Sequence, residues 1–208
     1  MLNKHRKNRN KSLPPRILIL CEGESEIKYL KGFRGEEENR RRLSAVDVEI
    51  YQPSDYSPYG LLLEAKRKIK DAKKVGRPYV ETWLVFDKDS HANIPKTFTE
   101  AETEGVKIAF SLICFEYWVL LHFERTTHYF ANCEDMVRHI EHKGYIKNYS
   151  KTNYYNNIKN LIPTAIDNAK WLHKQNEFEI KGGTRVYDLH AYTNFDMLFT
   201  RLDQIDIK

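Results

Sequence analysis

The sequence predicts an α/β protein with a parallel sheet of about four strands, flanked by helices and followed by a C-terminal helical lobe. Up to residue 113, strand-like and helix-like segments alternate, as in a sheet with right-handed crossover connections. Two of the strand-like segments are short, continuous apolar runs, which is typical of strands buried on both faces. After residue 115 only helical patterns follow. These three observations favour a parallel α/β core that precedes a helical extension.

Four segments are expected to form strands. Residues 17–21 form one continuous apolar run, and residues 81–86 contain the other. Residues 46–51 alternate apolar and acidic side chains, which predicts a half-exposed strand near one edge of the sheet. Residues 106–113 form the last apolar run of the alternating region.

The helices are predicted from apolar stripes and from their end signals. Residues 24–33 follow the first strand, and residues 60–74 carry an apolar stripe opposite lysines. Residues 96–104 form a short helix that Gly105 ends. The expected helices of the C-terminal part are 115–123, 133–143, 154–176, with a kink or break at Pro163, and 194–205.

Length and composition predict one globular domain with an appended lobe. The chain has 208 residues, of which 41% are hydrophobic and 30% are charged. We expect a disordered basic arm over residues 1–15, an α/β core over 16–123 and a mostly helical extension packed on that core over 124–208. No apolar stretch approaches the roughly 18 residues that a membrane span needs, and the N-terminus does not resemble a signal peptide. A cytoplasmic location without membrane contact is therefore expected.

The net charge of +5 comes from the N-terminal arm. Residues 1–16 contain six cations and no acid, and the rest of the chain is close to neutral. Basic arms often contact nucleic-acid phosphates, so Arg9 and Lys11 are candidate substrate contacts. A solvated tail is an equally good interpretation of the same charge run.

The three cysteines, Cys21, Cys114 and Cys133, lack the spacing of a metal site. Cys21 and Cys114 lie in apolar runs, so they are interpreted as small buried hydrophobic residues rather than catalytic thiols.

Acidic residues follow both of the continuous apolar strands. Glu22 and Glu26 come after the first strand, in the sequence Glu-Gly-Glu-Ser-Glu, and Asp87 and Asp89 come after 81–86. Ligand sites in open α/β sheets lie outside the carboxyl ends of the strands, so the four carboxylates converge if the two strands are neighbours. Magnesium prefers oxygen ligands, and metal sites for phosphoryl transfer need several converging carboxylates.

Each acidic motif alone is weak evidence. Acids at a helix N-terminus are favoured by the helix dipole, and an Asp-x-Asp motif after a strand is often only a turn. Together, at the ends of the two most apolar strands, they indicate a divalent-cation site, because clustered carboxylates repel one another without a counter-charge.

These motifs resemble those of a known family. Glu22-Gly-x-x-Glu26 followed by Asp87-x-Asp89 looks like a Toprim domain, and the run 114–123, Cys-Phe-Glu-Tyr-Trp-Val-Leu-Leu-His-Phe, looks like the RloB-like family. The resemblance covers roughly residues 15 to 205. One departure is that Ser111-Leu-Ile113 stands where the family usually has Ser-Asn-Pro.

The resemblance implies a Toprim-like fold, an activity and partners. Glu22 would be the glutamate that acts in acid/base catalysis or binds the metal, and Glu26, Asp87 and Asp89 would ligate Mg²⁺ or Mn²⁺. The family is found beside an ATPase, RloA, in restriction or phage-defence loci. The chain is accordingly expected to act as a metal-dependent nuclease subunit, on DNA in preference to RNA. Lys151 is a candidate for neutralising a phosphate in the transition state.

Other polar residues have a structural and a functional interpretation. Glu116 lies in an apolar run, so it either pairs with a cation or borders the site. His122 is favoured as a satisfied, partly buried histidine rather than a ligand. His91 and Lys88 follow the second acidic strand end, where they are candidate substrate contacts, although a surface loop is the better interpretation for His91. Glu24 is expected to be exposed.

Two other functions compete with a nuclease. A non-catalytic subunit would use the same pocket to sense a phosphorylated ligand or to hold the ATPase. A receiver-like phosphotransfer domain would use Asp87 as acceptor, but no lysine ends a later strand where a receiver needs one.

Overall fold

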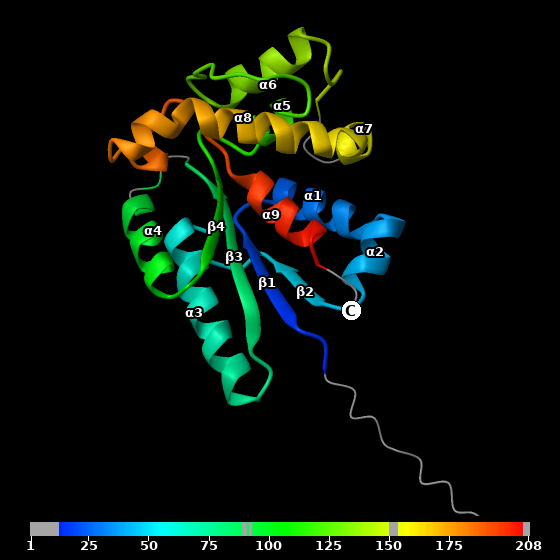
Figure 1. Ribbon diagram of the computed structural model, residues 1–208, viewed down its shortest axis with the longest axis vertical. Coiled ribbons are helices and arrows are strands. Elements are labelled where there is room, and N and C mark those ends of the chain that lie inside the picture. The colour runs from blue at the N-terminus through cyan, green and yellow to red at the C-terminus, as the bar shows by residue number, and fades with distance from the viewer. Residues whose placement is uncertain (1–12, 89–90, 92, 150–153, 206–208) are drawn as a thin grey trace, which may run out of the picture.

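The computed structural model of the protein describes residues 13–88, 91, 93–149 and 154–205 (Figure 1). Its centre is a four-stranded sheet in the order β2-β1-β3-β4, and every pairing is parallel. The strands are β1 (Arg16–Cys21), β2 (Asp47–Tyr51), β3 (Tyr79–Asp87) and β4 (Lys107–Ser111). The predicted parallel sheet, with β2 as an edge strand, is confirmed.

Helices cover both faces of the sheet and its carboxyl end. The α-helices of the described part are α1 (Glu24–Gly35), α2 (Glu37–Leu43), α3 (Pro58–Lys74), α4 (Ile94–Thr103), α5 (Glu116–Leu120), α6 (Cys133–His142), α7 (Tyr155–Ile158), α8 (Ile162–Lys181) and α9 (Phe195–Asp203). Figure 1 shows α3 and α4 on one side of the sheet and α1 and α9 on the other. Helices α5 to α8 lie above the ends of the strands, where the site is expected. None of the described helices is both long and apolar enough to cross a membrane.

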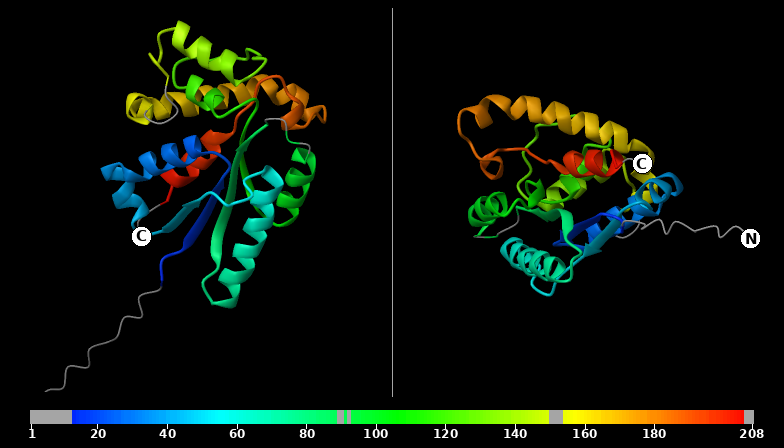
Figure 2. Two further views of the ribbon diagram at one scale, coloured as in Figure 1. Left: turned by 180° about the vertical axis from the view of Figure 1, so that it is seen from behind. Right: turned by 60° about the horizontal axis from the view of Figure 1, so that its bottom comes forward.

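The apolar run of β1 alternates between two hydrophobic cores. Ile17, Ile19 and Cys21 pack on the α1 and α9 side, while Leu18 and Leu20 pack on the α3 and α4 side. All five are at most 1% exposed. Residues of one strand point alternately to opposite faces, so a continuous apolar run is what a strand covered by helices on both sides requires. Figure 2 shows the two layers of helices from behind and from below.

Strand β4 is shorter than predicted. It ends at Ser111, because Leu112 donates its N–H to Tyr192 O at 2.8 Å and Ile113 has a positive φ of 73°. A β-branched residue seldom takes this conformation, so the apolar character of 106–113 alone did not indicate the turn.

The free edge of β4 is closed by the segment before α9. Asn194 Nδ2 donates to Ile108 O at 2.9 Å, and Asn194 Oδ1 accepts from Phe110 N at 2.6 Å. Ser111 and Thr193 form an isolated antiparallel bridge, and their hydroxyl groups lie 2.7 Å apart. The side chain of Asn194 thus replaces a strand partner at the edge of the sheet.

Two predicted helices differ from those observed. The helix expected over 115–123 is α5, which ends at Leu120 and continues as a turn. The pattern over 154–176 is divided: Tyr155–Ile158 and a 3₁₀ turn, Lys159–Leu161, precede α8, which extends to Lys181. Pro163 lies in the first turn of α8, where its missing N–H costs no helix hydrogen bond, so the predicted break is confirmed.

Candidate active site

The carboxyl ends of β1 and β3 lie side by side. In the register of the two strands Cys21 pairs with Val85, and the N–H of Glu22 donates to Val85 O at 2.9 Å. The N–H of Asp87 donates to Glu22 Oε2 at 3.3 Å. The sheet itself therefore positions the two acids next to each other, as the neighbouring strands require.

The start of α1 explains why Gly23 and Glu26 are spaced as they are in the motif Glu-Gly-x-x-Glu. Gly23 is the N-cap, with an extended backbone, and Glu26 lies in the first turn of the helix. A Cβ at residue 23 would overlap the Glu26 carboxylate, so only glycine lets that side chain lie back over the cap. Glu26 is 4% exposed despite its charge.

The acids meet in one cavity of about 340 Å³. Glu22, Glu26 and Asp87 line it together with Glu116 from the first position of α5. Asp89, the fourth acid of the sequence prediction, lies outside the described residues. The cavity thus gathers carboxylates from β1, α1, β3 and α5, a set of hard oxygen atoms that suits Mg²⁺ or Mn²⁺.

Glu116 borders the cavity and is 1% exposed. Its Oε1 accepts a hydrogen bond from the Tyr149 hydroxyl at 2.9 Å, and its Oε2 lies 3.1 Å from Cys133 Sγ. Burial, followed by the nearby Glu116 charge, raises the pKa of Tyr149 well above its ordinary value. The phenol therefore keeps its proton and remains a donor to the carboxylate.

His91 contacts Glu22 directly. Its Nε2 lies 2.6 Å from Glu22 Oε1, and the two side chains are 28% and 13% exposed. The loop after β3 therefore brings an imidazole to the edge of the acidic cavity, although a surface loop was the favoured interpretation for this residue.

The other predicted site residues have different locations. Lys88 is exposed and lines a second cavity of about 460 Å³, which shares Asp87 with the first. Lys151, Arg9 and Lys11 lie outside the described residues. Glu24 is exposed, as expected, and its carboxylate pairs with Lys28 at 2.8 Å.

His122 is a buried structural residue. It is 1% exposed, with Nε2 at 2.7 Å from the Tyr29 hydroxyl and Nδ1 at 2.9 Å from Trp118 O. Burial lowers its pKa to about 4, so the ring is neutral at physiological pH. The structural interpretation is correct, and the burial is more complete than predicted.

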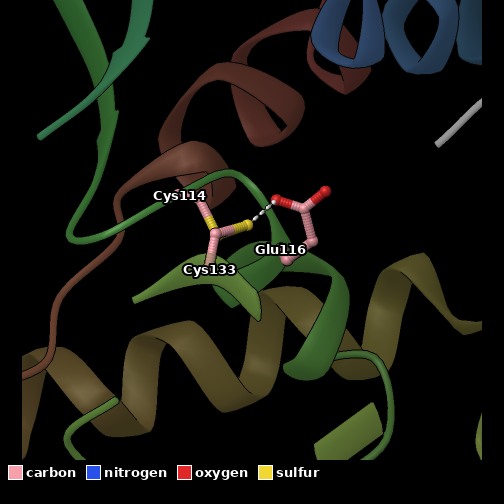
Figure 3. A group of neighbouring side chains, drawn as sticks. All are labelled: Cys114, Glu116 and Cys133. Atoms are coloured by element: carbon pink, nitrogen blue, oxygen red, sulfur yellow. Dashed lines mark hydrogen bonds between the residues drawn. A yellow bond between two sulfur atoms is a disulfide. The ribbon is translucent and has the colours of Figure 1, made fainter. Parts of the chain in front are cut away.

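The interpretation of Cys114 as a simple buried hydrophobic residue was wrong. Cys114 and Cys133 form a disulfide, with 5.7 Å between their Cα atoms (Figure 3). Cys21 is 0% exposed, and burial raises its thiol pKa well above the ordinary value, which agrees with a structural role. The bonded residues lie 19 positions apart in the sequence, and no local pattern indicated the bond.

Sequence reasoning also missed Gln52 and the contact of Tyr149 with Glu116. Gln52 lines the acidic cavity, and its side-chain amide donates to Glu22 O. Its position directly after β2, the neighbour of β1, is a signal that could have indicated it. Tyr149 had no such signal, because its contact with Glu116 depends on how 143–149 folds over α5.

The sequence matches one known protein family over most of its length. The profile of the RloB-like protein family matches residues 17–202. The chain belongs to the RloB-like family. The match begins in β1 and ends in α9, so this RloB-like chain carries the acidic cavity and the Cys114–Cys133 pair within the family region. Comparison with curated proteins found no match.

Proposed function

We propose that this RloB-like protein is a divalent-metal-dependent nuclease subunit of an ATPase-linked phage-defence system. The observation that supports the proposal is the single cavity lined by Glu22, Glu26, Asp87 and Glu116 at the carboxyl ends of β1 and β3. The first three acids, and Asp89 two positions after Asp87, belong to the motifs that resemble a Toprim domain, and this resemblance supports such an activity.

Glu22, Glu26 and Asp87 would hold Mg²⁺ or Mn²⁺, together with Asp89. The bound cation would stabilise the charge that develops on the phosphate oxygens during cleavage. Strand ends and the first turn of α1 fix these carboxylates, so little reorganisation is needed when the substrate binds. Glu116 adds a further carboxylate to the lining of the cavity, and its hydrogen bond from Tyr149 fixes the orientation of that carboxylate.

Glu22 would also accept or donate the proton that is transferred in the reaction. Its Oε1 and the Nε2 of His91 are close enough, at 2.6 Å, to share a proton. Its Oε2 is held by the N–H of Asp87, which fixes the direction of the carboxylate. DNA is the preferred candidate substrate over RNA, and an RloA-like ATPase is the expected partner.

The test combines metal binding with cleavage. Mn²⁺ and Mg²⁺ are titrated calorimetrically into the wild type, Asp87→Asn and Asp167→Asn, which removes an exposed acid of α8. DNA and RNA cleavage are then measured with the protein alone and with the ATPase. We expect binding and cleavage to be lost in Asp87→Asn only. A wild type that binds no metal and cleaves neither polymer, with or without the ATPase, would contradict the proposal.

A non-catalytic binding subunit is the second candidate. Both oxygens of Glu22 already have protein partners, the N–H of Asp87 and the ring of His91, as expected for an acid with a structural role. This function predicts that nucleic acid or the ATPase binds equally well after metal is removed by a chelator, and that no cleavage appears.

A further inference from the structure

Two sulfur atoms and a carboxylate gather where the loop after β4 meets α6. Cys114 precedes α5, Glu116 is the first residue of α5, and Cys133 is the first residue of α6. One ligand atom of each lies within 4.8 Å of the other two (Figure 3). Cys114 and Glu116 are buried and Cys133 is half-buried, so the group is part of the folded interior rather than a surface cluster.

The contact between Glu116 and Cys133 does not suit an oxidised sulfur. Glu116 Oε2 lies 3.1 Å from Cys133 Sγ. A sulfur atom in a disulfide carries no hydrogen, so the pair has a hydrogen bond only when Cys133 is a thiol. In the disulfide form, Glu116 Oε2 and Cys133 Sγ are two electron-rich atoms that face and repel each other. A proton or a cation between them would attract both.

We propose that the reduced pair, Cys114 and Cys133, binds a thiophilic divalent cation of the Zn²⁺ class, with Glu116 as the third protein ligand. Two thiolates and a carboxylate select Zn²⁺ over Mg²⁺, because thiolates are soft ligands that Mg²⁺ avoids. Three protein ligands leave one tetrahedral position for water or substrate. This site shares Glu116 with the acidic cavity of the proposed Mg²⁺ site, but its other two ligands are sulfur atoms that do not line that cavity.

The backbone geometry fits this ligand set. Zn–S bonds of about 2.3 Å at a tetrahedral angle place the two sulfur atoms about 3.8 Å apart. The Cα atoms of Cys114 and Cys133 are 5.7 Å apart, so side-chain rotation after reduction can supply this separation without moving either helix. Both cysteines line the cavity of about 460 Å³, which gives a cation access and leaves room for a water ligand.

The reduction that opens the site needs a dithiol as the electron donor. The dithiol breaks the Cys114–Cys133 bond and becomes a disulfide itself, while its two protons and two electrons form the two cysteine thiols. Cation binding then releases both thiol protons to solvent. The disulfide and the cation-bound dithiolate therefore exclude each other, and the reduced dithiol is the intermediate between them.

Cobalt is the probe for the test. The full-length protein is reduced anaerobically with a phosphine, desalted and titrated with Co²⁺ in excess Mg²⁺, which occupies oxygen-only sites. We expect one Co²⁺ per chain, with thiolate-to-cobalt charge-transfer absorption that Zn²⁺ abolishes by displacement. The untreated disulfide form should show no such absorption.

Three variants locate the ligands. Cys133→Ser should abolish the absorption, and Glu116→Gln, which keeps both thiols, should retain it with an affinity about tenfold or more lower. Cys21→Ala, which removes the third cysteine, should behave as the wild type. Circular dichroism checks that each variant is folded, and Glu116→Gln provides the decisive comparison if Cys133→Ser is not. Absence of the absorption from the reduced wild type, or unchanged affinity in Glu116→Gln, would overturn the proposal.

Discussion

Glu22 Oε1 and His91 Nε2 lie 2.6 Å apart although 69 positions separate the two residues in the chain. Glu22 follows β1, and His91 belongs to the loop between β3 and α4. The pairing of β1 with β3 brings the two side chains together, and Glu22 also lines the acidic cavity.

Glu22→Gln should weaken Mn²⁺ binding without unfolding the protein. Glutamine has the same shape and keeps an oxygen for the N–H of Asp87, but it loses the charge that attracts the cation. We expect a loss of at least about tenfold in affinity, which corresponds to roughly 1.4 kcal/mol, measured by calorimetry. Glu24→Gln is the matched control, because Glu24 is exposed and pairs with Lys28 of its own helix. Equal losses in the two variants would show that overall charge, and not the cavity, attracts the metal.

Gly23→Ala should displace Glu26 from the cavity. The added Cβ would overlap the Glu26 carboxylate, so that side chain or the N-terminus of α1 must move. We expect weaker Mn²⁺ binding and a decrease in unfolding free energy of about 1–3 kcal/mol, from chemical denaturation. Gly35→Ala is the control: nothing lies within 4 Å of a Cβ there, and the change should stabilise α1 by about 0.5 kcal/mol. Normal metal binding by Gly23→Ala would mean that Glu26 is not needed.

His122 should make the protein less stable in mild acid. The pKa of His122 is lowered from 6.5 to about 4 in the folded protein, so the unfolded chain binds its proton more readily. Stability from this group is complete above pH 6.5 and is lost as the pH falls towards 4, by about 2 kcal/mol at pH 5. Urea denaturation at pH 7 and pH 5 measures the loss, and His122→Gln should lack this component. His142→Gln, which changes an exposed histidine, should lose as much stability between pH 7 and pH 5 as the wild type does. If His122→Gln loses that same amount, His122 is not the group responsible.

Asn194→Ala should destabilise the edge of the sheet. Both side-chain hydrogen bonds to β4 are lost, which leaves Ile108 O and Phe110 N without their side-chain partner, while the backbone N–H of Asn194 still donates to Phe110 O at 3.0 Å. We expect a cost of about 2 kcal/mol and a decrease in Tm of roughly 4–8 °C. Asn157→Ala removes an exposed asparagine and should leave the Tm unchanged. A similar Tm for both variants would show that other contacts hold the edge.

The sequence was most informative where one local pattern determines the structure. The apolar runs of β1 and β3 predicted buried neighbouring strands, because only a strand covered on both faces needs such a run. It was least informative where distant segments meet. The Cys114–Cys133 bond, the Tyr149–Glu116 contact and the early end of β4 at Ile113 each depend on tertiary packing that no local spacing encodes.

The closure of β4 by Asn194 has a consequence for how the chain is made. The hydrogen-bonding partners lie 84 and 86 positions apart, so a ribosome completes the sheet long before it supplies the residue that covers its edge. During that interval the nascent chain presents a bare strand edge, to which other strands can add. Synthesis is therefore the stage at which this fold is most exposed to aggregation, and a chaperone that shields strand edges would be of most benefit before α9 emerges.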